Sequence, residues 1–201
     1  MNRITAVILA GGKSQRMTYD KQEIELREGR LIEKLVYGLD AIFDRVLVVT
    51  NRPQLYGDLP CNAIADIHPG HGPISGLHAA LTYSPTELVY LLACDMPNLN
   101  PAFIQYMVDC YEDVYDGVMT RKGEHIEPMN ALYHRRLLPL VEKQIEAASY
   151  RIFHLAEKAN FLYISQRVAR EFSREGDMYY NINTIADLED YEGLAMKKQD
   201  D

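Results

Sequence analysis

Residues 5–16 read Thr5-Ala6-Val7-Ile8-Leu9-Ala10-Gly11-Gly12-Lys13-Ser14-Gln15-Arg16. An apolar run that ends abruptly in two glycines, a hydroxyl and cations is typical of a buried strand that passes into an anion-binding loop. The glycines let successive backbone N–H groups turn towards one point, while Lys13, Arg16 and Lys21 add positive charge. The stretch predicts a site for a triphosphate; an exposed turn with ordinary cations is the alternative.

Two common phosphate-binding loops do not fit this stretch. A P-loop that ended at Gly12, Lys13 and Ser14 would need a glycine at position 7, where the chain has Val7. A dinucleotide fingerprint fails because Gly11 and Gly12 are adjacent and no third glycine follows at the required spacing. A glycine-rich nucleotide loop of another kind remains.

Further strands are predicted at Val46–Thr50 and Asn62–Ala65, and each is followed by a polar residue. The ligand crevice of an open α/β sheet lies just beyond the carboxyl ends of its strands. Asn51 is therefore placed where it can hold a base or ribose, and an asparagine that forms a turn before Pro53 is an equal alternative.

The most hydrophobic strand predicted, Leu88–Ala93, runs into Cys94 and Asp95. A carboxylate at the end of a central strand is costly to bury, and Mg²⁺ with phosphate oxygens is its usual partner. We therefore expect Asp95 to be the metal ligand; an aspartate that only bonds turn amides is the alternative. We interpret Cys94 as a packed residue, because no histidine or cation nearby would lower its pKa.

Helical spacing and turn residues define the remaining elements. Helices are expected at Leu31–Ile42, Ile74–Tyr83, Pro101–Tyr111, Leu137–Ala148 and Arg151–Lys158, and another is expected after Thr184 as N-cap. Strands are expected at Val114–Thr120, Glu127–Tyr133 and Phe161–Ile164, with a hairpin-like excursion over residues 121–125 and a polar interval after Ile164. Asn181 and Asn183, two apart in an extended segment, can present both amides to one ligand.

Size and charge narrow the class of protein. The 201 residues and 47% apolar composition suit one domain, expected over residues 1–195 with a disordered tail at 196–201. A net charge of −8 argues against nucleic acid and anionic membranes as partners. Three cysteines without CxxC spacing favour a reducing cytoplasm, and no apolar stretch approaches the roughly 20 residues that cross a bilayer.

Residues 9–17 together with Asp20 and Lys21 resemble the signature of the nucleotidyltransferases that join NTPs to phosphorylated acceptors, and match the molybdenum cofactor guanylyltransferases best. Three later segments resemble the same family in the same order. They are Asp66 with Gly72–Gly76, the strand Glu127–Tyr133 that a Glu-Pro pair introduces and that is expected to face the acceptor, and Asn181–Leu188. The chain departs from the family at Thr18, where glycine is usual, and at Ile185, where proline is usual. The departure at Thr18 concerns the shape of the glycine-rich loop, and the departure at Ile185 concerns the rigidity of the first turn of the helix after Thr184.

The resemblance implies an α/β fold of the nucleotide-diphospho-sugar transferase type, a three-layer αβα sandwich with a mostly parallel, Rossmann-like sheet. It implies transfer of GMP from GTP to molybdopterin-bound molybdenum with release of pyrophosphate, and Mg²⁺ as cofactor. It also implies proteins that deliver or insert the cofactor as partners. The alternatives are a molybdopterin cytidylyltransferase, a sugar-phosphate nucleotidyltransferase, or a non-catalytic carrier of nucleotide or cofactor.

The roles expected of individual residues follow from the motifs and the resemblance together. Asp66 contacts the nucleotide by resemblance, and His68 and His71 are interpreted as loop residues rather than a metal pair. Asn181 and Asn183 orient the acceptor. The expected catalytic residues are Arg16, Lys21 and Asp95, with Asp95 as metal ligand, and the expected nucleotide-binding residues are Leu9, Ala10, Gly11, Lys21, Asn51, Asp66 and Asp95.

Overall fold

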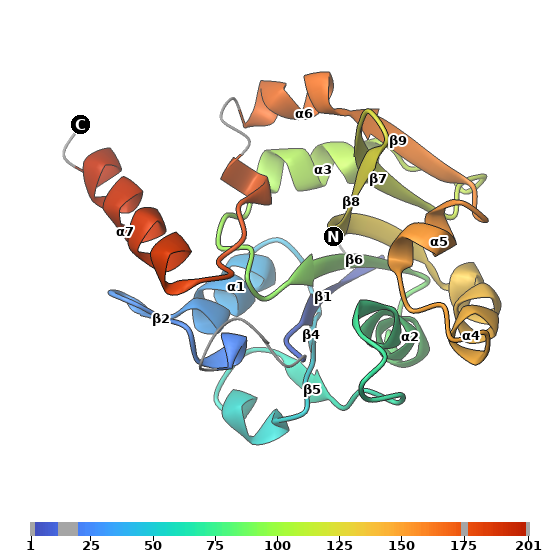
Figure 1. Ribbon diagram of the computed structural model, residues 1–201, viewed down its shortest axis with the longest axis horizontal. Helices are drawn as coiled ribbons and strands as arrows, with labels where there is room; N and C mark the ends of the chain where they lie inside the picture. Colours follow the sequence, from blue (N-terminus) through green and yellow to red (C-terminus); the bar gives the residue numbers. More distant parts are fainter. Residues whose placement is uncertain (1–2, 12–19, 174–176, 200–201) are drawn as a thin grey trace.

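The computed structural model describes residues 3–11, 20–173 and 177–199 (Figure 1). The strands are β1 (Ile4–Leu9), β2 (Glu25–Leu26), β3 (Gly29–Arg30), β4 (Val46–Val49), β5 (Asn62–Ile64), β6 (Leu88–Ala93), β7 (Gly117–Lys122), β8 (His125–His134) and β9 (Phe161–Ser165). The α-helices are α1 (Leu31–Asp40), α2 (Pro73–Tyr83), α3 (Pro101–Cys110), α4 (Leu138–Glu146), α5 (Ile152–Ala156), α6 (Gln166–Phe172) and α7 (Ile185–Gln199).

Seven of these strands form one sheet in the order β5-β4-β1-β6-β8-β7-β9. Among them β8 alone runs antiparallel to its neighbours β6 and β7. The predicted mostly parallel sheet is therefore confirmed. Because the other six strands share one direction, their carboxyl ends all lie at the same edge of the sheet.

Helices cover both faces of the sheet (Figure 1). One hydrophobic core includes residues of α1, α3 and α6, such as Leu35, Phe103 and Ala169. The other includes residues of α2, α4 and α5, such as Leu77, Val141 and Leu155. Along β1, Ile4, Ala6 and Ile8 belong to the first core, while Val7 and Leu9 belong to the second. A strand buried on both faces is mostly apolar, and the buried Thr5 of β1 has a hydrogen-bond partner in Thr86 Oγ1 at 2.7 Å. The predicted three-layer sandwich is confirmed.

The predicted strand Val114–Thr120 begins three residues too early and ends two residues too early. Val114 is 63% exposed, and β7 starts at Gly117, where an added Cβ would lie 2.1 Å from the carbonyl oxygen of Leu132. The ladder also continues through Lys122, which pairs with His125. The expected excursion over residues 121–125 is therefore a continuation of the sheet that closes in a tight turn.

The helix α6 was not predicted. Its segment was expected to be a polar interval, and of its residues only Ala169 is fully buried. The Ser165 hydroxyl accepts a 3.4 Å hydrogen bond from the Val168 N–H and caps the first turn. None of the helices within the described ranges is long and apolar enough to cross a membrane.

Candidate active site

The polar residues that follow the parallel strands meet at one edge of the sheet. Leu9, the last residue of β1, pairs with Val49 of β4 on one side and with Ala93 of β6 on the other. The three segments stay hydrogen-bonded to one another beyond the strand ends, because Ala10 N donates to Val49 O over 2.9 Å and Cys94 N donates to Leu9 O over 3.1 Å. The turn after β1 therefore lies between the segments that carry Asn51 and Asp95.

Lys21 joins two other predicted site residues. Its ammonium nitrogen Nζ lies 2.5 Å from Asp95 Oδ2 and donates a 2.7 Å hydrogen bond to Asn183 Oδ1. The backbone also connects these segments, because Ile182 N donates to Asp95 O over 2.8 Å. Three segments that are remote in sequence thus place a cation, a carboxylate and an amide in direct contact.

The second carboxylate oxygen of Asp95, Oδ1, is buried and has no hydrogen-bond partner among the described residues. Leaving a buried charged oxygen unpaired is costly, and a bound cation would satisfy it. Carboxylate and amide oxygens are ligands that hard divalent cations prefer. The donor set of Asp95 and Asn183 therefore fits a divalent metal.

The position of Asn183 is fixed by the start of α7. Asp187 Oδ2 accepts hydrogen bonds from Asn183 N (2.9 Å) and Thr184 N (2.8 Å), and Thr184 Oγ1 accepts one from Asp187 N (3.1 Å). These bonds, chiefly that from Asn183 N, lower the pKa of Asp187. The predicted N-cap at Thr184 is confirmed, within a reciprocal capping box. Ile185, in place of the expected proline, is 52% exposed.

The two asparagines differ in their contacts. Asn183 Oδ1 accepts from Lys21, whereas Asn181 Nδ2 donates to Tyr179 O over 2.8 Å. Both side chains are half-buried. The structure thus brings Asn183 to Lys21 and Asp95, and the role of Asn181 towards an acceptor stays a prediction.

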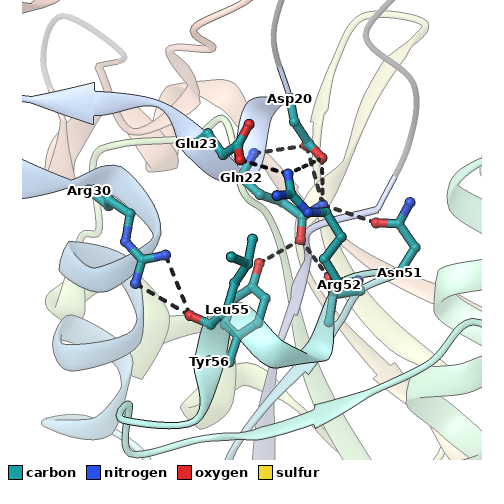
Figure 2. A network of polar contacts seen from close by, with 9 residues as sticks. Asp20, Gln22, Glu23, Arg30, Asn51, Arg52, Leu55 and Tyr56 are labelled. Atoms are coloured by element: carbon teal, nitrogen blue, oxygen red, sulfur yellow. Dashed lines mark hydrogen bonds and ion pairs between the residues drawn. The ribbon is translucent and has the colours of Figure 1, made fainter.

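The contacts of Lys21 with Asp95 and Asn183 are called the junction below. A polar network centred on Gln22 adjoins it (Figure 2). Gln22 is 1% exposed, and its Nε2 donates to the Asp20 carboxylate (3.1 Å to the nearer oxygen) and to Asn51 Oδ1 (3.1 Å). Its Oε1 accepts from Thr50 Oγ1 (2.5 Å) and Tyr56 OH (2.8 Å). Asn51 itself is exposed. Gln22 was not predicted as a site residue, because a glutamine between Lys21 and Glu23 has the appearance of a surface residue.

Arg52 closes the outer side of the network. Its guanidinium lies 2.8 Å from Glu23 Oε1 and 3.5 Å from Asp20 Oδ2. The hydrogen bond to Glu23 is the main reason that the pKa of Arg52 is raised. Arg52, which is itself held by Glu23, therefore keeps Asp20 beside Gln22 (Figure 2).

Asp66 lies in the loop after β5, at the same edge of the sheet. Its Oδ1 accepts from His68 N (2.9 Å) and from Ser75 Oγ (2.7 Å), so it orders the loop that leads into α2. The ring of His68 packs edge-on against His78, with centroids 4.8 Å apart, and His71 stacks on Tyr150 at 4.5 Å. Within the described ranges, the hydrogen bonds of Asp66 go to its own loop and not to Lys21, Asp95 or Asn183, and its contact with nucleotide stays a prediction.

Glu127 is a carboxylate at this edge that was not predicted as a site residue. Leu92 of β6 pairs with Asn130 of β8, so the antiparallel strand β8 brings Glu127 to the level of Asp95. Glu127 Oε1 accepts from Met129 N over 3.1 Å. Burial is the largest cause that raises the pKa of Glu127, and the charge of Asp95 adds to it. The only signal in the sequence was the Glu127–Pro128 pair.

Two further expectations concern Cys94 and the glycine-rich loop. Burial raises the pKa of the Cys94 thiol to about 12, as befits a packed residue rather than a nucleophile. Residues 12–19, which include Lys13 and Arg16, lie outside the described residues. The catalytic role of Arg16 therefore stays a prediction, while Leu9, Ala10 and Gly11 lie where the loop was expected to begin.

Known proteins resemble this chain along most of its length. The family model described as a MobA-like NTP transferase domain matches residues 6–159. A probable molybdenum cofactor guanylyltransferase from Peptoclostridium acidaminophilum is 39% identical over 97% of this chain and 91% of its own length. The molybdenum cofactor guanylyltransferase of Syntrophotalea carbinolica is 39% identical over 92% of this chain and 89% of its own.

A solved structure shares the fold. The crystal structure of molybdopterin-guanine dinucleotide biosynthesis protein A from Archaeoglobus fulgidus has a TM-score of 0.85 and 25% sequence identity, covering 96% of this chain and 99% of that one. The family match includes residues 6–9 of β1, Lys21 and Asp95, which form the first part of the site described above.

Proposed function

The chain belongs to the family of MobA-like NTP transferases, and we propose that it acts there as a molybdenum cofactor guanylyltransferase. It would transfer GMP from GTP to the molybdopterin-bound molybdenum cofactor and release pyrophosphate. The observation that carries this proposal is the junction of Lys21, Asp95 and Asn183 beside the glycine-rich turn. It assembles a phosphate-binding cation and oxygen ligands at the edge where α/β sheets bind nucleotides.

The nucleotide lies along the carboxyl ends of the first strands. Gly11 offers its backbone N–H to the phosphates, because glycine allows a close approach. The Ala10 N–H is already bonded to Val49 O, so Ala10 and Leu9 would shape the turn rather than donate to phosphate. Asn51 faces the base or ribose, and Asp66 contacts the nucleotide from the loop after β5. Lys21 and Arg16 neutralise the triphosphate.

Asp95 and the amide oxygen of Asn183 would hold a divalent cation, which we propose to be Mg²⁺. When bound, it would neutralise phosphate charge and orient the reacting phosphates. Lys21, now bonded to Asp95 and Asn183, would bind phosphate oxygens in their place. Its positive charge would then lie near the charge that develops on the departing pyrophosphate.

The acceptor needs positioning more than deprotonation. A phosphate monoester is largely ionised near neutral pH, with a second pKa of about 6, so it is nucleophilic once it is held in line. Asn183 can direct its Nδ2 donor to this phosphate while its Oδ1 faces the cation. Asn181 supports the same segment. The proposal further includes a cytoplasmic location, partners that deliver or insert the molybdenum cofactor, and one domain over residues 1–195.

The test measures pyrophosphate release from GTP, CTP and ATP with Mg²⁺, each with and without purified molybdopterin cofactor. We expect release with GTP that depends on the acceptor, and a larger rise in melting temperature with GTP than with CTP or ATP, because a ligand of the folded state stabilises it. Turnover of CTP in place of GTP would identify a cytidylyltransferase. Nucleotide binding without any turnover would identify a carrier.

A further inference from the structure

The hydrogen bonds of Gln22 have only one consistent direction. The Asp20 carboxylate only accepts hydrogen bonds, so the group of Gln22 that lies 3.1 Å from it has to be the donor Nε2. Oε1 then faces Thr50 and Tyr56, whose hydroxyls both donate to it. Arg52 N donates to Thr50 Oγ1 over 2.9 Å, which leaves the Thr50 proton free for Gln22. The carboxamide of Gln22 cannot be reversed without placing two acceptors against each other.

The orientation of the Gln22 carboxamide fixes the orientation of the Asn51 amide. The second proton of Gln22 Nε2 points to Asn51 and requires an acceptor there, which is Oδ1 at 3.1 Å. The Asn51 amide nitrogen therefore points away from the network, as Figure 2 shows. Gln22 is buried and Asn51 is exposed, so a ligand meets the Asn51 donors and not Gln22.

Two outward N–H donors distinguish one kind of base edge from another. Guanine presents the acceptors O6 and N7 on one edge, whereas adenine and cytosine present an amino group, N6 or N4, at the corresponding place. An amide that could rotate freely would offer its oxygen to an amino group equally well. An amide held with its nitrogen outward would not.

We propose that Gln22 is a specificity-positioning residue, which fixes the Asn51 amide with its donors outward so that the site accepts bases with an oxygen at position 6 and disfavours those with an amino group there. The inference rests on the proposed function, since it assigns the base choice of that same nucleotide site. It adds the polarity of Asn51 and the residue that imposes it.

The experiment measures dissociation constants for GTP, ITP and ATP, with Mg²⁺, in the full chain and two variants. ITP keeps the oxygen at position 6 and lacks the 2-amino group, so it isolates the contact to that oxygen. Asn51→Asp keeps an acceptor for Gln22 and replaces the outward donors by an acceptor. The GTP:ATP and ITP:ATP affinity ratios should both fall about tenfold, the order expected for one reversed hydrogen bond. Any general effect of the added charge on triphosphates cancels in these ratios.

Gln22→Met tests the positioning role, because Gln22 does not reach the ligand. Both ratios should fall severalfold, whereas a residue with a merely structural role would weaken all three nucleotides alike. Asn62→Asp, at the exposed start of β5 on the opposite edge, is the matched control and should leave the ratios unchanged.

The outcomes separate this inference from the proposed function. A wild-type preference for GTP with unchanged ratios in Asn51→Asp overturns the inference alone. Equal wild-type affinity for GTP and ATP overturns both. If Gln22→Met does not fold, Asn51→Asp still decides whether the outward amide selects the base, and a uniform loss of affinity in a folded Gln22→Met overturns the role of Gln22.

Discussion

The ammonium of Lys21 lies 2.5 Å from Asp95 Oδ2, beside the carboxylate that is the expected metal ligand. The side chains are 21% and 12% exposed, so solvent screens this pair only partly. A divalent cation that binds Asp95 competes with an internal cation already in contact with it. The arrival of a triphosphate relieves this competition by giving Lys21 other anions to bind.

Lys21→Met should therefore have opposite effects on metal binding and on turnover. Removal of the competing charge should increase the affinity of the nucleotide-free protein for Mn²⁺ by about tenfold or more. The same change should lower kcat/KM for GTP by roughly a hundredfold, because a cation near developing charge is lost. Mn²⁺ binding can be measured by electron paramagnetic resonance and turnover by pyrophosphate release.

The control for metal affinity is Lys34→Met, which removes an exposed lysine of α1. For turnover the comparison is Lys13→Ala, for which we expect a loss at least about ten times smaller than for Lys21→Ala, or roughly 1.4 kcal/mol in barrier height. Unchanged Mn²⁺ affinity in Lys21→Met would refute the competition. A greater loss in Lys13→Ala would show that the loop was misinterpreted.

Asp95→Asn should reduce turnover at least about a hundredfold while the protein stays folded. The substitution keeps the size of the side chain and removes the charge that binds Lys21 and the metal. Circular dichroism checks the fold, and pyrophosphate release checks turnover. Asp58→Asn, at an exposed aspartate, is the matched control. Near-normal turnover of Asp95→Asn with Mg²⁺ would refute the metal assignment.

Thr184→Ala should weaken the acceptor side of the site more than the nucleotide side. It removes the N-cap hydroxyl that accepts from Asp187 N, at a cost of about 1 kcal/mol in the free energy of unfolding. Because Asp187 also holds Asn183 N, we expect KM for the acceptor to rise severalfold while binding of GTP changes little. Thr184→Ser keeps the hydroxyl and should behave as wild type. Equal losses for GTP and acceptor would contradict the assignment of this segment.

Glu127→Gln should stabilise the protein more at pH 8 than at pH 5. Burial raises the pKa of Glu127, so the folded state holds this proton more tightly than the unfolded state, and the free energy of unfolding falls as pH rises through the raised pKa. Glutamine keeps an acceptor for Met129 N and removes the titration. Urea unfolding at the two pH values measures the difference, with exposed Glu124→Gln as control. A stability change of the same size at both pH values would contradict this explanation.

Elements with strong local patterns were predicted well from the sequence. The strand Leu88–Ala93 has the predicted bounds, and Asp95 lies directly beyond it, because a continuous apolar run limited by polar residues fixes both ends. The predicted start of β7 was wrong, because Val114 is apolar yet exposed. The hydrophobicity of a residue alone cannot show whether it is buried. The helix α6 was missed because a short surface helix buries too few residues to produce a helical spacing of apolar residues in the sequence.

Site residues were predictable where the residue type and its position imply one chemistry. They were not predictable where tertiary contacts determine which residue is buried and what it binds. Asp95 and Lys21 follow from a carboxylate after a buried strand and a cation after a glycine-rich turn. Gln22 is different, since its burial arises from Thr50 and Tyr56, residues of a distant segment with no local signal. Tertiary contacts of this kind determine which polar residue is interior.

The contacts of Lys21 span long stretches of chain, because its sequence separation is 74 positions from Asp95 and 162 from Asn183. Closing such long loops costs entropy before any contact is gained, and non-local contacts of this kind form late during folding. A molecule whose sheet and helices have formed but whose final segment has not docked lacks Asn183 at Lys21. Recovery of nucleotide binding after denaturation should therefore lag behind recovery of secondary structure, which makes the ligand a probe of the last folding step.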